Sequence, residues 1–185
     1  SYKLNKFFNL AFFTGIGQIL PLFSFPIITN YLNVIPSDFG NLAIYISSVN
    51  ILAVLTGLGF NILIPTEKNI NKVLSILKSS LITSFILNIF ILIIVIIFSD
   101  TLQQITDLSP NIFYLMPINV FLINLCISFY YYNFRINKIF ISSFSKLLRG
   151  SIYSFLLILF SYFMYGYKGM IFSYFLSWLV CSIYF

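Results

Sequence analysis

Long uncharged apolar stretches constrain this chain more than any other feature of its sequence. The ten basic and four acidic residues fall in clusters, and the runs between the clusters are rich in Leu, Ile and Phe. One helical crossing of a bilayer requires about 17 to 25 such residues. The composition agrees, because 60% of the residues are hydrophobic and 8% are charged, whereas soluble domains carry about 25% charged residues. We therefore predict an integral membrane protein.

The apolar runs are expected to be helices. Backbone amides in hydrocarbon must be satisfied within their own segment, and these runs lack the period-two alternation of barrel strands. The predicted fold is an all-α membrane protein, a polytopic transmembrane helical bundle that occupies residues 1–185 as one unit. The six predicted spans are 7–32, 39–63, 77–98, 112–134, 147–164 and 169–185.

Prolines and short polar loops mark where these helices bend and begin. The first span contains Pro21 and Pro26, which predicts a kink, because neighbouring helices, hydroxyl side chains or water can satisfy the carbonyls that proline leaves without a donor. In the loop before the second span, Ser37 is expected as the N-cap, with Asp38 in the first turn. Pro110 is expected at the first position of the fourth span.

The distribution of Lys and Arg predicts the orientation. Numbering the connections from the N-terminus, alternate ones carry nine of the ten basic residues, and the other set carries Lys168 together with Asp38, Asp100 and Asp107. The positive-inside rule then places the N-terminus and the basic connections in the cytoplasm. The nine basic residues are Lys3, Lys6, Lys68, Lys72, Lys78, Arg135, Lys138, Lys146 and Arg149.

Enzyme chemistry finds little support in the sequence. The chain has no histidine, and its carboxylates fall in predicted loops, so we expect no catalytic residue, metal site or cofactor within the membrane. Cys126 and Cys181 lie within spans and are expected to pack as small hydrophobic side chains. The net charge of +6 is explained by topology and by anionic lipid, so we expect membrane lipids as partners and no nucleic acid.

Uncharged polar residues recur at helical spacing inside the spans. Because polar side chains avoid lipid, these stripes should face the interior of the bundle. They can form helix-to-helix hydrogen bonds, at about 0.6 kcal/mol each, or they can line a hydrated cavity for a polar headgroup. The stripes are Thr14 and Gln18 in the first span, then Ser47, Asn50, Gly57 and Asn61, and then Asn124, Ser128, Tyr131 and Arg135.

Arg149 has two interpretations. It lies close to the predicted start of the fifth span, so its side chain can snorkel to the cytoplasmic interface. Alternatively, Arg149, Lys146 and Arg135 attract a phosphate from the cytoplasmic side, a task that suits a guanidinium.

Three stretches resemble a known family. TNYLNVIPSDFGNLAIY followed by TGLGFNILIP, and later YYNFRINKIFISSFSKLLRGSIYSFLLILFSYFMYGYKGMIFSYFLS, resemble polysaccharide biosynthesis proteins of the oligosaccharide flippase family, in the multidrug/oligosaccharidyl-lipid/polysaccharide exporter superfamily. The resemblance covers nearly the whole chain through loose patterns. One departure is Asn30, which is neutral where many relatives have a basic residue.

The resemblance implies a function. It implies that the chain is the N-terminal lobe of a two-lobe transporter in a bacterial cytoplasmic membrane. The substrate would be a polyprenyl-pyrophosphate-linked oligosaccharide repeat unit of O-antigen or capsular polysaccharide, moved by alternating access beside other polysaccharide-assembly membrane proteins. The chain begins at Ser1 and stops at Phe185 inside an apolar run, so we expect a longer protein with a second unit in parallel.

Two other classes of protein remain open at this point. One is a membrane scaffold subunit that transports nothing. The other is a segment of a membrane glycan polymerase or ligase, which should carry essential charged residues in a large outer loop. The longest predicted outer connection, residues 99–111, is short and has no Arg, which counts against the polymerase.

Overall fold

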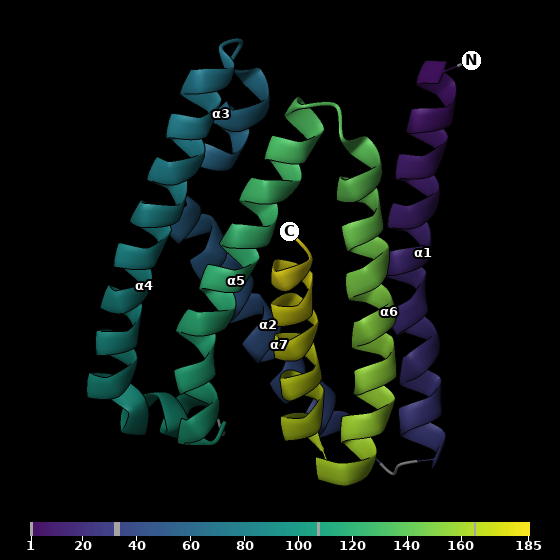
Figure 1. Cartoon of the computed structure of the whole chain (residues 1–185). Helices are drawn as coiled ribbons and strands as arrows, with labels where there is room; N and C mark the ends of the chain where they lie inside the picture. The colour runs from purple at the N-terminus through teal and green to yellow at the C-terminus, as the bar shows by residue number, and fades with distance from the viewer. Residues whose placement is uncertain (1, 32–33, 107, 165) are drawn as a thin grey trace.

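The chain folds into a bundle of α-helices. The structure is a computed structural model, and it describes residues 2–31, 34–106, 108–164 and 166–185. These residues form seven helices and no strand (Figure 1). The predicted all-α membrane fold is thereby confirmed. The helices are α1 (Tyr2–Tyr31), α2 (Pro36–Gly57), α3 (Phe60–Thr66), α4 (Ile70–Thr106), α5 (Pro110–Arg135), α6 (Ile139–Met164) and α7 (Tyr167–Tyr184).

Five helices are long and apolar enough to cross a bilayer, namely α1, α2, α4, α5 and α6. α7 forms at the predicted sixth span, but it is not among these five, so the sixth crossing stays a prediction. The chain runs up and down, so that the start of α1, the α3–α4 connection and the α5–α6 connection lie at one end of the bundle (Figure 1). Those are the connections rich in Lys and Arg, and the positive-inside rule predicts that this end is cytoplasmic.

Three boundaries differ from the predicted spans. The second span is interrupted, because Leu58 and Gly59 adopt left-handed backbone conformations between α2 and α3. The third span extends into the long helix α4, which has a non-helical residue at Phe98. α6 begins at Ile139 rather than at Leu147, so Arg149 lies about 15 Å along the helix axis, not near its start.

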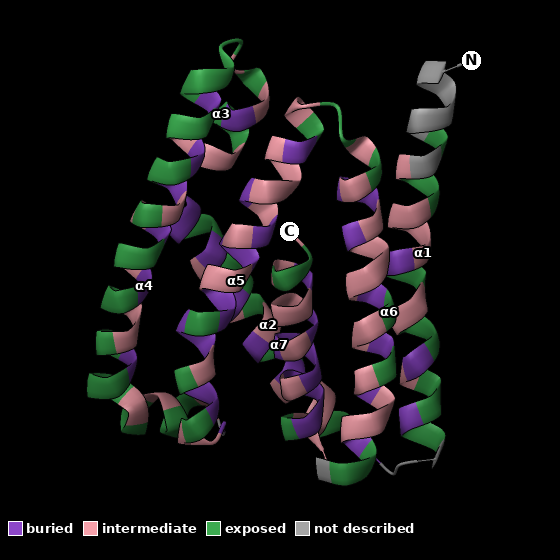
Figure 2. Cartoon of the chain, in the orientation of Figure 1, coloured by how far each residue is buried: buried purple, intermediate pink, exposed green. Residues whose placement is uncertain are grey.

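The outer helix α4 buries polar side chains in the middle of its inner face and exposes large apolar ones. Ser80, Ser84 and Asn88 lie one helical turn apart on its buried face. Its other faces expose large apolar side chains, among them Phe85, Ile89, Phe90, Ile93 and Ile97 (Figure 2). A soluble protein buries such side chains, whereas lipid solvates them at no cost. These exposed apolar side chains support a bilayer around the bundle.

α1 and α6 pack against each other through glycine. Pro21 has no N–H to donate to the Gly17 carbonyl, and that carbonyl faces Gly150 of α6, where a β-carbon would overlap it. A β-carbon on Gly17 would in turn lie 2.5 Å from the Lys146 carbonyl. Small residues permit this close approach of two backbones. α1 continues as one helix through Pro21 and Pro26, so the kink expected there stays a prediction.

The polar loop ahead of α2 caps the helix differently from the prediction. The N-cap is Ile35, with Pro36 at the first helical position, so Ser37 is not the N-cap. Asp38 accepts a hydrogen bond from the Ile35 N–H at 3.3 Å and another from the Tyr167 N–H at 3.1 Å. The carboxylate therefore joins the start of α2 to the start of α7. The expected start of α5 is confirmed, with Ser109 as N-cap and Pro110 following it.

The α1–α6 contact predicts the effect of one added methyl group. Gly150→Ala should destabilise the protein by about 1–3 kcal/mol, because the β-carbon cannot fit against the Gly17 carbonyl. Gly15→Ala is the matched control on α1, where a β-carbon meets no atom within 4 Å, and it should be neutral or slightly stabilising. Thermal unfolding in detergent compares the two variants. Equal stability of the two variants would contradict the close contact.

Candidate functional site

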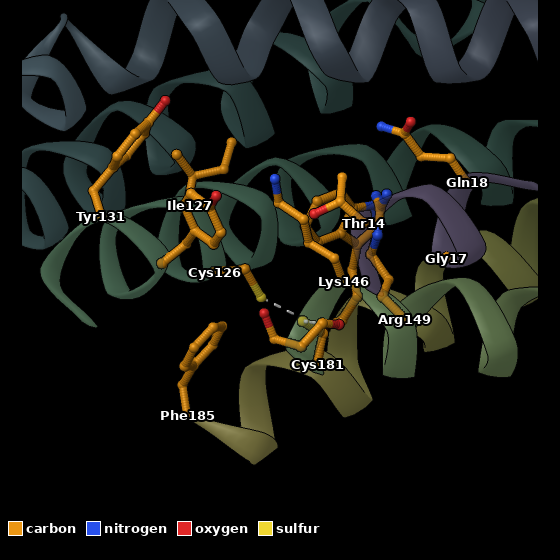
Figure 3. Close-up of a pocket in the computed structure, with 13 residues that line it drawn as sticks. Thr14, Gly17, Gln18, Cys126, Ile127, Tyr131, Lys146, Arg149, Cys181 and Phe185 are labelled. Carbon is orange, nitrogen blue, oxygen red and sulfur yellow. Dashed lines mark hydrogen bonds between the residues drawn. The ribbon is translucent and has the colours of Figure 1, made fainter. Parts of the chain in front are cut away.

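A basic cavity of about 230 Å³ lies between α1, α5, α6 and α7. α1 contributes Thr14, Gly17 and Gln18, and α6 contributes Lys146 and Arg149. In Figure 3 the Lys146 and Arg149 side chains lie toward Thr14 and Gln18. The glycine contact between α1 and α6 positions these groups, because it holds the backbone that carries Gln18 against the backbone that carries the two cations. The other lining residues are Cys126, Ile127, Tyr130, Tyr131, Ser145, Trp178, Cys181 and Phe185.

Both cations in this cavity rest on aromatic rings. The Lys146 ammonium lies 4.3 Å from the centre of the Tyr130 ring, and the Arg149 guanidinium carbon lies 4.2 Å from the Trp178 ring. Such cation–π contacts contribute about 0.5–2 kcal/mol each. They orient the cations but leave their positive charge unneutralised. The Arg149 guanidinium is thus held on α7 and does not extend along α6 to the end of the bundle that is predicted to be cytoplasmic.

The acidic side chains that the structure describes lie away from this cavity. Asp38 caps α2, Glu67 follows α3, and Asp100 lies near the end of α4. Within the described ranges, no carboxylate forms a salt bridge with Lys146 or Arg149. A charged side chain at the centre of a membrane costs about 2.5–3.5 kcal/mol on insertion scales. An uncompensated pair of cations therefore needs hydration or an anionic ligand.

Arg135 is separated from this pair. Its Nε donates to the Glu67 carbonyl at 2.8 Å and its Nη2 donates to the Lys68 carbonyl at 3.0 Å. These bonds brace the connection between α3 and α4. In the same loop, the Asn69 N–H donates to the Glu67 carboxylate and lowers its pKa, with Lys72 and Arg135 adding smaller effects. Arg135 therefore has a structural task, and the proposed phosphate cluster is reduced to Lys146 and Arg149.

A second cavity, here called the asparagine cavity, has a volume of about 400 Å³ and lies at the α2–α3 break. Asn50, Asn61 and Asn124 line it, together with Gly57 and Gly59. It also shares Ile127 and Tyr131 with the basic cavity, so the two are neighbours. Its polar groups are amides, the Tyr131 hydroxyl and backbone, and its lining contains no charged side chain.

A buried polar network supports the asparagine cavity. Asn124 Nδ2 donates to Thr56 Oγ1 at 2.7 Å and to Ser84 Oγ at 3.1 Å. Ser128 Oγ donates to Asn61 Oδ1 at 2.8 Å and lies 3.2 Å from Ser80 Oγ. These bonds join α2, α3, α4 and α5, so helix-to-helix hydrogen bonding and a polar cavity occur together here.

The structure distributes the predicted site residues among five places. Gln18, Lys146 and Arg149 line the basic cavity, and Thr14 accompanies them as its spacing from Gln18 predicted. Asn50, Asn61 and Asn124 line the asparagine cavity. Ser128 is buried in the network beside that cavity, and Arg135 braces a loop. Ser47 is exposed on α2 and lies outside the linings of both cavities.

Several participating residues were not predicted. Ser80, Ser84 and Asn88 have a spacing of four within an apolar run, a signal that could have identified them. Trp178 and Tyr130 have no such local signal, because their role depends on contacts between distant helices. Cys126 and Cys181 are buried free thiols, as expected for small packing residues, yet both also line the basic cavity.

Comparison with models of known protein families found no match, and searches of curated proteins and of solved structures also found none.

The contrasting surroundings of Arg149 and Arg135 predict opposite effects on stability. Arg149→Met should leave the protein equally stable or stabilise it by about 1 kcal/mol, because the membrane cost of the charge exceeds its cation–π contact. Arg135→Met should destabilise it by about 1.5–3 kcal/mol, because two hydrogen bonds to carbonyls are lost. Thermal unfolding in detergent measures both. Marked destabilisation by Arg149→Met would assign that residue a structural role.

Proposed function

We propose that this protein translocates a polyprenyl-pyrophosphate-linked oligosaccharide across a bacterial cytoplasmic membrane by alternating access. The observation that carries the proposal is the pair Lys146 and Arg149, which lies without a carboxylate partner in a cavity inside the bundle. A pyrophosphate is the complementary group, since it accepts charge-assisted hydrogen bonds from a guanidinium and an ammonium together. It also supplies the negative charge that the described part of the protein does not bring to this cavity.

The surroundings of the two cations suit the rest of such a substrate. Gln18 and Thr14 offer polar groups to sugar hydroxyls, while Tyr130 and Trp178 already face the cations. Thr14 Oγ1 is buried without a hydrogen-bond partner, so it is available to a ligand or to water. The prenyl chain stays in lipid, against apolar outer faces such as those of α1 and α4.

The resemblance to oligosaccharide flippases supplies the remaining parts of the proposal. A second lobe of similar design would complete the cavity around a repeat unit larger than this lobe encloses. The N-terminus and the basic connections would lie in the cytoplasm, where the lipid-linked substrate of O-antigen or capsule export is assembled. Translocation needs no covalent catalysis by the protein. A membrane scaffold, by contrast, has no need of uncompensated cations inside the membrane.

Exchange of a lipid-linked substrate between the two leaflets of proteoliposomes tests the proposal. The protein is reconstituted with a polyprenyl-pyrophosphate oligosaccharide that carries a fluorescent group on the sugar, and an impermeant reductant reports the fraction in the outer leaflet. Arg149→Gln should slow exchange between leaflets by about 10- to 100-fold, because a charge-assisted hydrogen bond is lost. Lys72→Gln is the matched control, since Lys72 is exposed near the start of α4, away from both cavities.

Two results would contradict the proposal. One is exchange no faster than in protein-free vesicles. The other is equal exchange by the wild type and by Arg149→Gln, which would leave the two cations without a part in transport.

A further inference from the structure

The helix break between α2 and α3 lies inside the predicted second span and ends α2 there. α2 ends at Gly57, and Leu58 (φ 44°) and Gly59 (φ 72°) turn the chain before α3 begins at Phe60. The last turn of a helix has up to four carbonyls without intrahelical partners. They form the negative end of the helix dipole. The asparagine cavity lies at this end of α2.

The amide of Asn124 adds a side-chain oxygen to these carbonyls. Asn124 is 1% exposed, and its Oδ1 has no hydrogen-bond partner. Its orientation is fixed from the other side: Thr56 Oγ1 donates its proton to the Leu52 carbonyl at 2.8 Å and so can only accept from Asn124 Nδ2. The nitrogen therefore points to Thr56, and the oxygen is left facing the cavity.

The Asn61 side chain on α3 lies near the same position, beside Gly57. A β-carbon on Gly57 would lie 3.2 Å from Asn124 Oδ1 and 3.4 Å from Asn61 Nδ2. Ser128, which is hydrogen-bonded to Asn61, has a hydroxyl that can donate or accept a hydrogen bond. The same holds for Ser80, which is hydrogen-bonded to Ser128. The Asn61 amide can therefore turn over and present its oxygen beside Gly57 while it keeps a hydrogen bond to Ser128.

We propose that the asparagine cavity binds one alkali-metal cation, such as Na⁺, between the C-terminal end of α2 and the amides of Asn61 and Asn124. The geometry points to a hard cation because Asn124 Oδ1 is a neutral oxygen, and Asn61 supplies a second one once its amide turns over. Unwound backbone carbonyls and the C-terminal ends of broken helices coordinate Na⁺ in membrane transporters. The lining contains no carboxylate, which disfavours Ca²⁺ and Mg²⁺, since sites for these ions use carboxylates.

Asn124 differs from the other buried asparagines because it lines this cavity. Asn119 and Asn88 also have an Oδ1 without a partner, but neither lines this cavity. Asn119 provides a matched control, because it lies on the same helix, is 0% exposed and donates to Tyr45. Binding of the cation goes beyond the proposed function and does not depend on it. Only a role for the ion in driving transport rests on the proposed function.

Cation-dependent thermal unfolding tests this site in the absence of any transport substrate. The purified protein in detergent is titrated with NaCl, KCl or LiCl against N-methyl-D-glucamine chloride at constant ionic strength. A ligand that binds the folded state raises the unfolding temperature in a saturable way, so at least one alkali-metal salt should do so. Gly57→Ala should shift the midpoint of that titration at least about tenfold upward, because its methyl group occupies the space beside Asn124 Oδ1.

Paired variants separate loss of the site from loss of the fold. Alanine is a good helix former, so Gly57→Ala should stay folded, and Gly15→Ala should keep the wild-type cation response. Asn124→Leu should lose the response, whereas Asn119→Leu should keep it even at a lower unfolding temperature. No cation-specific rise in the wild type would overturn the proposal and leave a cavity that holds water only. A rise that persists in both Gly57→Ala and Asn124→Leu would also overturn it. Because no oligosaccharide is present, either result is independent of the transport assay.

Discussion

The contact between Gly17 and Gly150 is the interaction on which the basic cavity depends. It brings the backbones of α1 and α6 closer than any side chain would permit. Gln18 follows one glycine and Arg149 precedes the other, so the same contact sets the separation of the polar groups that face the cavity. The contact also gives Pro21 a role. Because Pro21 has no N–H to donate, the Gly17 carbonyl is free and faces α6. Proline, which weakens helices in soluble proteins, supports helix packing here.

The bilayer determines where apolar and polar side chains lie in the rest of the bundle. Lipid solvates the apolar outer faces of α4 without penalty. The polar side chains therefore decide which side of a helix faces the bundle. Most of these groups are satisfied by neighbouring helices, as in the network of Thr56, Ser84 and Asn124. Lys146 and Arg149 are different, because aromatic rings hold them but no described carboxylate neutralises them. Charges retained at such a cost are expected to act on a ligand.

Sequence alone predicted the helical class, most span positions and the grouping of Thr14 with Gln18. These features depend on hydropathy and on the period of a single helix. The break at Leu58 and Gly59 was missed, because a smooth apolar run extends across it and the stripe from Asn50 to Asn61 fits one unbroken helix. The early start of α6 was missed for a related reason. Its first turns contain Ser142, Ser143 and Ser145, which look like loop residues but are buried between helices.

The partners of the two cations could not be predicted for a different reason. Trp178 and Tyr130 come from α7 and α5, and nothing in their local sequence specifies which charged group they meet. The resemblance to oligosaccharide flippases supplied a substrate class but no contact. The geometry of the cavity reduced the candidate phosphate-binding residues from three to two, because Arg135 is held by the loop after α3.

The central claim is that water reaches Lys146 and Arg149 inside the membrane. Cysteine accessibility measures this directly, with single cysteines placed at Gln18 and at Phe23 of α1 in a protein whose Cys126 and Cys181 are replaced by Ala. Gln18 is exposed and lines the basic cavity, whereas Phe23 is 69% exposed on another face of the helix, outside that lining, and is expected to contact lipid. In native membranes open to reagent from both sides, a charged thiol reagent should modify Gln18→Cys readily and spare Phe23→Cys. Protection of Gln18→Cys to the same extent as Phe23→Cys would mean a dry cavity and would contradict the account.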